Sequence, residues 1–525
     1  MSPSSSFVFL SSIFLLLFLA YSPTALTPVH AAAGEVGYFV LIDAGSTGSR
    51  AHVHQYVKDP TKKLPVVDES TNKKIKPGLS YYAEKDPPAV RKSIKELLDF
   101  IKETVPQKYW AQTPIHVQAT AGLRSVTPTE ANTVLEIVRD DLETSGFLFQ
   151  RTWARIISGE QEGINGWMAV NYLLGVFDQS TDSDGQPPQS TGVVEMGGSS
   201  MQITFAPSAP TKEDKKQLKE IDIAGHKYFL YTHSFLQYGL QAAEKLYQRL
   251  AINDIEDGGN PCYPRAFRHS SVGDFDRCTQ LLTKVVDKSV ECSSTCSFNG
   301  VYQPKIANEP FFAIENFYYT AKFFGTDQEQ NQVALPNPEE RAPASGNPVT
   351  NGLRAKGKEF CNRDWPSLLE SYKGKTPTEE LSYFCFSAAY QSVVLESGLG
   401  FHPRSNLRVA KMINGKGIDW EMGATILELI GSGPSAHDGV EDPASRARLG
   451  NTIGSTVDFD TSLALPSSQN RVRSNASQGG ICKSCLLYTI LFALVVVLAY
   501  FTYQRWMKRQ SGPMTSYSQA AFNRV

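Results

Sequence analysis

Short apolar runs alternate with amphipathic segments along the first two fifths of the chain. The apolar runs are rich in β-branched and aromatic residues and end at polar or glycine-rich turns, which predicts buried strands over 37–43, 114–119, 153–158 and 192–195. Apolar residues at helical spacing predict helices over 90–105, 127–142 and 165–174. Thr129 is expected to cap the second of these helices. Strands that alternate with helices predict an α/β protein with parallel strand pairing.

Polar stretches divide this pattern into parts. The loop 178–191 separates an expected N-terminal lobe, residues 36–191, from a C-terminal lobe, residues 192–430. Residues 325–357 are rich in Pro, Asn and charge, so we expect a surface excursion there. Residues 431–485 lack periodicity and are expected to form a stalk.

Both ends of the chain are strongly apolar. Phe7–Ala20 is too short for a membrane span and resembles the core of a signal peptide, so residues 1–33 are interpreted as a leader or, alternatively, an uncleaved N-terminal anchor. Residues 486–503 carry no charge and precede Arg505, Lys508 and Arg509, which predicts one transmembrane helix that contacts lipid. The tail 504–525 would then be cytoplasmic and the bulk of the chain lumenal or extracellular.

Cysteine usage agrees with an oxidising compartment. Six of the eight cysteines lie between Cys262 and Cys385. Because short loops favour neighbouring partners, we expect the disulfides Cys262–Cys278, Cys292–Cys296 and Cys361–Cys385. A zinc site at Cys292 and Cys296 is the weaker alternative, since no second pair of suitable spacing accompanies them. Asn475 lies in an Asn-Ala-Ser sequence and is the expected glycosylation site.

The overall charge narrows the class of partner. The 525 residues include 51 Lys and Arg against 53 Asp and Glu, for a formal net charge of −2. This balance argues against a nucleic-acid binder that relies on surplus basic residues, and against a disordered acidic chain. A large folded protein with room for two cores remains.

One pattern recurs at the ends of two predicted strands. Asp43 is followed by Ala, Gly45, Ser46, Thr47 and Gly48; 152 positions later, Glu195 is followed by Met and then by Gly197, Gly198 and Ser199. Glycines allow backbone N–H groups to approach closely and hydroxyls add donors, so such turns can cradle phosphate oxygens. The acid at each strand end can hold a divalent ion through water. Two facing turns could therefore clasp a polyphosphate and its metal.

Further polar residues follow other strands. Glu160 and Glu162 lie between a predicted strand and helix, where a carboxylate could take a proton from water, although a solvated loop acid is the simpler interpretation. Ser200 and Gln202 could orient such a water. The stretch from Thr120 through Ala121 to Arg124 adds another glycine turn and a guanidinium, for which a surface arginine is the alternative.

Five ordered segments carry a family resemblance. Residues 43–50, 119–124, 157–167, 193–202 and 417–424 resemble the five signature regions of the apyrases, the nucleoside triphosphate–diphosphohydrolases that include membrane-bound ecto-enzymes. The resemblance extends over about residues 37–429. It implies a two-lobed actin/hexokinase-like (ribonuclease H-like) fold with the active site between the lobes. It also implies release of the γ- and then the β-phosphate of nucleotides with Ca²⁺ or Mg²⁺ and without a covalent intermediate.

The resemblance also implies roles for individual residues. Glu162 would be the general base, and Ser200, Gln202 and the backbone at Ala121 would hold the attacking water. Asp43 and Glu195 would hold the metal through its waters. The phosphate-binding residues would be Gly45, Ser46, Thr47, Gly48, Thr120, Arg124, Gly197, Gly198 and Ser199. Tyr318 or Tyr319 would stack on the nucleobase, whereas Trp420 is expected to pack between the lobes.

One departure and several alternatives accompany this interpretation. The family usually has Asp at position 195, and Glu195 reaches one methylene further, which bears on metal preference and rate. An exopolyphosphatase of the same superfold, and a nucleotide-binding surface receptor without catalysis, are the alternative functions. The expected substrates are nucleotides of the ATP, ADP, UDP and GDP class, and the expected location is the Golgi or the plasma membrane. The sequence makes no prediction of the oligomeric state.

Overall fold

The computed structural model describes residues 35–431, apart from 69, 269, 293–294, 308, 328–347 and 403–404. The predicted leader, stalk, transmembrane helix, cytoplasmic tail and the Asn475 glycosylation site lie outside the described residues. Within the described part of the chain, no helix is both long and apolar enough to cross a membrane.

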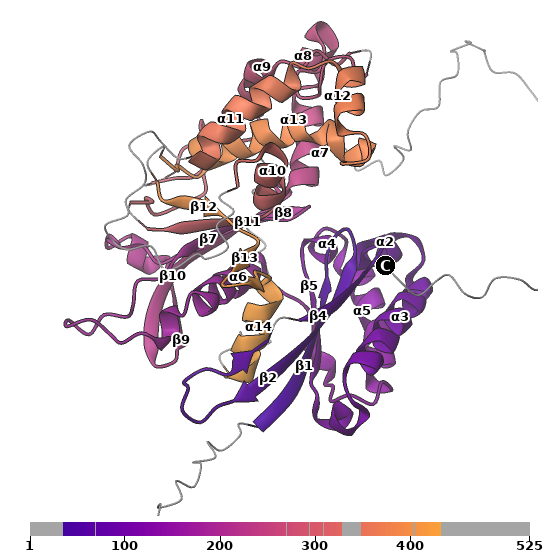
Figure 1. Cartoon of the computed structure of the whole chain (residues 1–525), viewed down its shortest axis with the longest axis vertical. Helices are drawn as coiled ribbons and strands as arrows, with labels where there is room; N and C mark the ends of the chain where they lie inside the picture. The colour runs from indigo at the N-terminus through magenta and orange to yellow at the C-terminus, as the bar shows by residue number, and fades with distance from the viewer. Residues whose placement is uncertain are drawn as a thin grey trace, which may run out of the picture. The chain divides into compact units, whose positions relative to one another are not determined.

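The first sheet is built from the N-terminal strands (Figure 1). Its order is β3-β2-β1-β5-β6, with β4 paired to β2. The strands are β1 (Glu35–Ala44), β2 (Ser49–Lys58), β3 (Val66–Val67), β4 (Thr71–Ile75), β5 (Ile115–Ala119) and β6 (Ala154–Ile156). Strands β1, β5 and β6 run parallel, and β2 pairs with β1 antiparallel. Helices α3 (Val90–Thr104) and α5 (Pro128–Glu143) bury their apolar faces in the same core as β1 and β5.

The second sheet has six strands in the order β12-β11-β7-β8-β10-β9. They are β7 (Gly192–Met196), β8 (Ser200–Phe205), β9 (Lys219–Ile223), β10 (His226–Leu236), β11 (Phe311–Glu315) and β12 (Leu407–Val409). Strands β7, β11 and β12 are parallel, and β8 to β10 form an antiparallel extension. One core joins this sheet to α7 (Leu240–Leu250), α9 (Phe275–Leu282), α11 (Pro348–Cys361) and α13 (Thr378–Val393).

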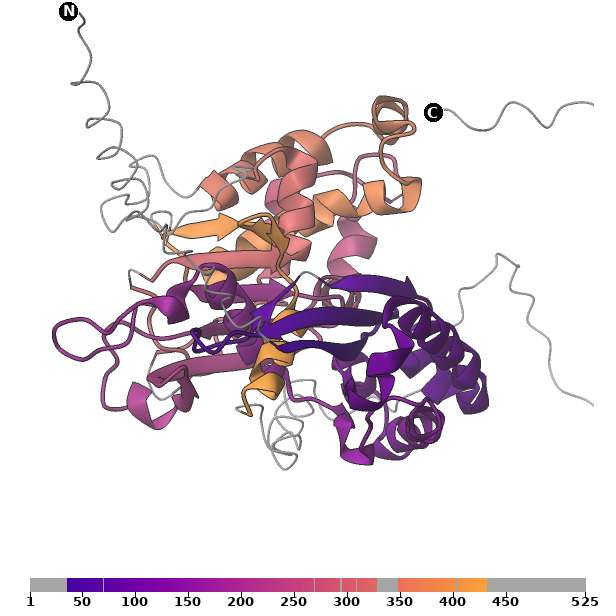
Figure 2. The ribbon, with the colours of Figure 1, turned by 60° about the horizontal axis from the view of Figure 1, so that its bottom comes forward.

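Two helices connect the sheets. Helix α6 (Gly159–Leu173) precedes the polar loop 178–191 but packs against β7, β8 and β10 of the second sheet. Helix α14 (Trp420–Leu429) packs against α6 and also contacts β1, and both ribbon views show it between the two sheets (Figures 1 and 2). Trp420 is buried with Phe39 and Leu41 of β1, and its packing between the lobes stays a prediction.

The remaining elements are short. They are α2 (Leu79–Lys85), α4 (Ala121–Arg124), α8 (Ile252–Gly258), α10 (Asn316–Phe324), α12 (Trp365–Tyr372), a π-helical turn over Val394–Gly398, and the hairpin strands β13 (Met412–Ile413) and β14 (Lys416–Gly417). Short 3₁₀ helices cover Pro87–Ala89, Gln107–Gln112, Arg151–Trp153, Val176–Asp178 and Asp214–Lys216.

The four predicted strands and three predicted helices are confirmed, but some local predictions were wrong. Helix α6 begins at Gly159, six residues before its predicted start, because Ser158 and Gln161 form a capping box that offsets the low helix propensity of the glycines. Helix α5 is capped by Thr127 and not by Thr129. Residues 348–357 belong to helix α11, whose Val349 and Leu353 are buried, so this part of the predicted surface excursion is core.

The three cross-links lie between residues 262 and 385, and the second of them is in the segment between α9 and β11. The structure joins Cys262 to Cys278, Cys292 to Cys296 and Cys361 to Cys385. The first and third bridges lie in the same apolar core, where Cys262, Cys278, Cys361 and Cys385 are fully buried.

Candidate active site

The two glycine turns lie at equivalent places in the two sheets. One follows β1 after Asp43, and the other follows β7 after Glu195. A methyl group added at Gly198 of the second turn would lie 3.3 Å from the Ser46 hydroxyl of the first. The turns therefore face each other across the junction of the sheets, as a shared phosphate site requires.

Backbone hydrogen bonds orient the second turn. The carbonyl of Gly198 accepts from the N–H of Gln241 at 3.0 Å, and the carbonyl of Ser199 accepts from the N–H of Gln237 at 2.7 Å. With the carbonyls held this way, the N–H groups of Gly198 and Ser199 find no acceptor among the described residues. Such free N–H groups in a tight turn form an anion-binding cradle.

The third sequence motif supports the first turn. The N–H of Thr120 donates to the carbonyl of Ala44 at 3.2 Å, which fixes the start of α4 beside β1. A methyl group at Gly122 would lie 2.8 Å from the Cα atom of Ser46, so only glycine permits this close approach. Thr120, Ala121 and Arg124 are buried next to the turn that contains Ser46.

Glu162 lies at the centre of a buried hydrogen-bonded set. Arg124 Nη2 donates to Glu162 Oε2 at 2.8 Å and to Ser200 Oγ at 3.2 Å. Gln202 Nε2 donates to Ser200 Oγ at 2.7 Å and lies 3.4 Å from Glu162 Oε2. Because Ser200 Oγ accepts from two groups that can only donate, its own hydrogen is available to a further acceptor. Four predicted site residues, from α4, α6 and β8, thus meet at one point.

The surroundings of Glu162 alter its proton affinity. Burial raises the pKa of this carboxyl above 4.5, and the charge and hydrogen bond of Arg124 oppose that rise. The alternatives of a solvated loop acid at Glu162 and of a surface arginine at Arg124 were wrong, because both side chains are buried. Glu160, one residue before Gln161, remains partly exposed.

Glu195 is a further buried carboxyl, and Asp43 is a partly buried one whose Oδ1 atom is enclosed. Burial, followed by the charges of neighbouring acids, raises the pKa of each well above its ordinary value. Asp43 Oδ1 and Glu195 Oε2 have no hydrogen-bond partner among the described residues. Repelling carboxylates with unpartnered oxygens fit a divalent cation, which would neutralise them. No group of three or more His, Cys, Asp or Glu side chains in the described chain is arranged to ligate a metal directly.

The structure adds acids that the sequence interpretation missed. Glu421 of α14 is buried and its Oε1 lies 3.1 Å from Nε2 of His52 on β2. Although burial opposes ionisation, His52 holds the pKa of Glu421 below its ordinary value. Glu315, at the end of β11, has a positive φ of 59° and burial raises its pKa to about 7. The acids that flank Trp420 in the fifth motif, Asp419 and Glu421, were the available signal for this group.

The two candidate base-stacking tyrosines differ in exposure. Tyr318 is buried, and its hydroxyl accepts from Lys322 at 3.2 Å. Tyr319 is 46% exposed, with the Lys411 ammonium 5.8 Å from its ring centre. The Tyr319 hydroxyl interacts electrostatically with Glu315 and Arg50, which places it near the acidic group. Tyr319 is therefore the one whose ring is open to a ligand.

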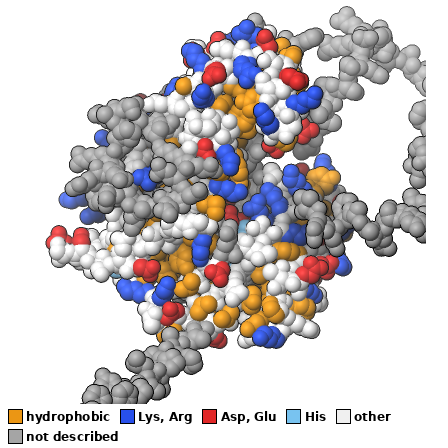
Figure 3. All heavy atoms as spheres, in the orientation of Figure 1, with side chains coloured by type: hydrophobic (Ala, Val, Ile, Leu, Met, Phe, Trp, Pro, Cys, Tyr) orange, Lys and Arg blue, Asp and Glu red, His pale blue; other side chains and the backbone are white. Residues whose placement is uncertain are grey.

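Basic side chains offset the acids of this region. Arg50 and Lys74 are the cations that most oppose the raised pKa of Asp43. Figure 3 shows Lys and Arg side chains gathered in the middle of the face that it displays. Local positive charge beside the glycine turns suits a polyanionic ligand in a chain whose net charge is near zero.

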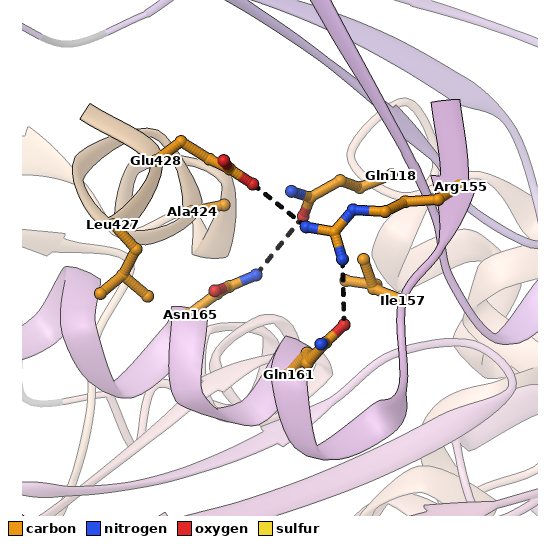
Figure 4. Close-up of a pocket in the computed structure, with 8 residues that line it drawn as sticks. All are labelled: Gln118, Arg155, Ile157, Gln161, Asn165, Ala424, Leu427 and Glu428. Atoms are coloured by element: carbon orange, nitrogen blue, oxygen red, sulfur yellow. Dashed lines mark hydrogen bonds and ion pairs between the residues drawn. The ribbon is translucent and has the colours of Figure 1, made fainter. Parts of the chain in front are cut away.

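A small pocket at the junction of the sheets is separate from this set (Figure 4). Arg155 of β6 contacts Glu428 of α14 at 3.1 Å and Gln161 of α6 at 3.4 Å, and Asn165 donates to Gln118 at 3.5 Å. None of the predicted site residues lines the pocket. The polar side chains that line the pocket form hydrogen bonds and an ion pair with one another, and these contacts connect β6, α6 and α14.

In each of the two sheets one strand ends at an acid followed by a glycine turn, and a buried carboxylate–guanidinium set lies beside these turns. This arrangement defines an actin-like α/β fold. A crystal structure of nucleoside triphosphate hydrolases from Neospora caninum shares this fold. It matches with a TM-score of 0.56 and 15% identity, over 82% of this chain and 98% of that chain.

The sequence comparisons identify the family. Residues 29–433 match the GDA1/CD39 (nucleoside phosphatase) family, and the chain belongs to it. Probable apyrase 3 of Arabidopsis thaliana is 33% identical over 432 residues, which cover 75% of this chain and 83% of the relative. Ectonucleoside triphosphate diphosphohydrolase 1 of Mus musculus is 30% identical over 396 residues, which cover 68% of this chain and 73% of the relative.

Proposed function

We propose that this protein is an apyrase that hydrolyses nucleoside tri- and diphosphates to the monophosphate and inorganic phosphate. The observation that carries the proposal is the buried set of Arg124, Glu162, Ser200 and Gln202 beside two facing glycine turns. Family membership supports the same activity. In this proposal two lobes, predicted over residues 36–191 and 192–430, hold the nucleotide in the cleft between them, with α6 of the first range packed on the sheet of the second.

The proposed reaction is direct attack by water on the terminal phosphorus. Glu162 takes one proton from the water as its oxygen bonds to phosphorus, and the bond from phosphorus to the bridging oxygen breaks. The products are inorganic phosphate and a nucleotide shorter by one phosphate. Arg124 fixes the Glu162 carboxylate, and Ser200 and Gln202 orient the water with the backbone at Ala121.

The glycine turns stabilise the charge that the phosphate carries. The second turn, in which the N–H groups of Gly198 and Ser199 have no acceptor among the described residues, faces the turn of Gly45, Ser46, Thr47 and Gly48. Preorganised N–H donors of this kind stabilise developing charge without reorganisation during the reaction. Gly197, Thr120 and Arg124 complete the proposed phosphate-binding set.

The proposed cofactor is Ca²⁺ or Mg²⁺, held through water by Asp43 and Glu195. The enclosed and unpartnered Oδ1 of Asp43 and Oε2 of Glu195 fit such an ion. A divalent cation bound there would neutralise part of the negative charge of the phosphates. A water-mediated contact tolerates the longer side chain of Glu195 better than direct coordination would.

The proposed setting is a membrane with the catalytic part on its lumenal or extracellular side, in the Golgi or at the plasma membrane. Relatives named as ectonucleoside enzymes and three disulfides in the described residues support an oxidising compartment.

Parallel measurements of phosphate release test the proposed activity. The purified protein is assayed with ATP, UDP and linear polyphosphate, each with Ca²⁺, with Mg²⁺ and with a chelator. We expect release from the nucleotides with either ion and none with the chelator. Release from polyphosphate alone would indicate the exopolyphosphatase, and binding without any release would indicate the receptor.

A further inference from the structure

Ser234 on strand β10 contacts the predicted water-holding residue Gln202. The two residues are directly opposite each other in the antiparallel pairing of β8 and β10. Gln202 Nε2 donates to Ser234 Oγ at 2.9 Å, nearly as close as its 2.7 Å bond to Ser200 Oγ. Ser234 lies outside the five family segments noted in the sequence, and nothing in the sequence pattern pointed to it.

The neighbours of the Gln202 amide determine which way it points. Glu162 Oε2, 3.4 Å away, can only accept when ionised, so the atom that faces it must be the NH₂ group and not the carbonyl oxygen. An NH₂ group has two hydrogens. Ser200 and Ser234 take them at the two short distances, and Glu162 is the long third contact. Ser234 therefore accepts the second hydrogen of the Gln202 amide, which would otherwise be donated to Glu162.

Packing against α6 fixes the position of Ser234. A methyl group on Gly159, the first residue of α6, would overlap the Ser234 side chain. Glycine at this position lets β10 approach the helix turn that carries Glu162. Ser234 is thus held between Gly159 on one side and the Gln202 amide on the other.

We propose that Ser234 is a positioning residue for the attacking water. It acts through Gln202: by accepting the second amide hydrogen it holds the amide towards Ser200 and leaves the Glu162 carboxylate to act on water. This inference rests on the proposed hydrolytic function. It assigns Ser234 no contact with substrate, so its loss is expected to change turnover and not nucleotide affinity.

Ser234→Ala tests the proposal. Without the second acceptor the amide can turn and donate to Glu162, so we expect kcat for ATP to fall about 10- to 100-fold while KM changes less than about threefold. A residue that only supports the sheet would lower stability without such a split between kcat and KM.

Thr232 supplies a matched control. It lies two residues away on the same face of β10, and its hydroxyl pairs with the opposite residue Thr204 at 2.8 Å. Thr232→Val removes a hydroxyl from the same strand without touching Gln202. We expect Thr232→Val to lower the Tm and to keep kcat within about twofold of wild type.

Two further variants complete the test: Ser234→Ala combined with Gln202→Ala, and Gly159→Ala, which moves the Ser234 side chain. In a Gln202→Ala background, Ser234→Ala should lower kcat less than about twofold further, because the amide it holds is gone. Gly159→Ala keeps every hydroxyl but displaces Ser234, and should also lower kcat.

The outcomes separate this proposal from the proposed function. An inactive wild type would overturn both. An active wild type with unchanged kcat in Ser234→Ala, or a full additional loss in the Gln202→Ala background, would overturn the role of Ser234 alone. If Ser234→Ala does not fold, unchanged kcat in Gly159→Ala would overturn it.

Discussion

Replacing Arg124 by methionine separates the electrostatic role of the buried guanidinium from its role in packing. The Arg124 and Glu162 side chains are 2% and 9% exposed, and their charged atoms are 2.8 Å apart. Removing one partner of such a buried pair costs about 3–5 kcal/mol, because the other charge stays buried without compensation. A single domain is stable by only about 5–15 kcal/mol, so the loss should be plain in denaturant unfolding.

The same variant should change the pH dependence in a defined direction. Burial already raises the pKa of Glu162 above 4.5, and Arg124 is the largest opposing influence. In Arg124→Met the pKa rises further, so the acidic limb of kcat/KM should move to higher pH. A raised carboxyl pKa favours the folded state while the group is protonated, and that contribution is lost as pH rises through the folded-state pKa. The stability deficit should therefore be smallest below the unfolded-state carboxyl pKa and grow as the pH rises through the raised folded-state pKa of Glu162.

Arg155→Met is the control for this experiment. Arg155 forms an ion pair with Glu428 at 3.1 Å, but the side chains are 15% and 21% exposed and lie outside the Glu162 set. We expect a cost of about 1.5–3 kcal/mol and an unchanged acidic limb. An acidic limb that stays in place in Arg124→Met, or moves equally in both variants, would refute the electrostatic argument.

Three further predictions follow from the site and the core. Ca²⁺ or Mg²⁺ at about 100 times its Kd should stabilise the wild type by about 2.7 kcal/mol. The double variant Asp43→Asn, Glu195→Gln should lose this gain, and without metal it should be more stable than the wild type. An equal gain in both proteins would contradict the metal site. Tyr319→Ala should raise KM for ATP about 5- to 100-fold and leave any hydrolysis of tripolyphosphate unchanged, since only the nucleotide offers a base for stacking; equal changes for both substrates would speak against stacking. Cys361→Ser with Cys385→Ser should cost about 3 kcal/mol, because the bridge closes a 24-residue separation; an unchanged denaturation midpoint would contradict this.

Sequence patterns were enough to predict the strands and helices around the glycine turns. The strands that end at Asp43 and Glu195 are apolar on both faces, and each ends at a turn that only small residues permit. The predicted start of α6 was wrong because glycines at 159, 163 and 166 obscured the helical pattern, whereas close packing requires small residues there. A methyl group at Gly163 would lie 2.5 Å from Thr204 Oγ1, a contact that no local pattern reveals.

The residues that the sequence missed depend on long-range pairing. His52 and Glu421 are separated by most of the chain, and only the packing of α14 against β1 and β2 brings them within 3.1 Å. Ser234 meets Gln202 through the register of β8 and β10. Residues that act through a partner on another element carry no signal of their own in one sequence.

The central claim is that Glu162 activates water for attack on a bound nucleotide. The most direct test compares turnover and nucleotide binding in Glu162→Gln, which keeps the side-chain size and removes the base. We predict that kcat for ATP falls by about 10²- to 10⁴-fold while the Kd of a non-hydrolysable ATP analogue stays within about threefold of wild type. A variant that keeps full turnover would contradict the account.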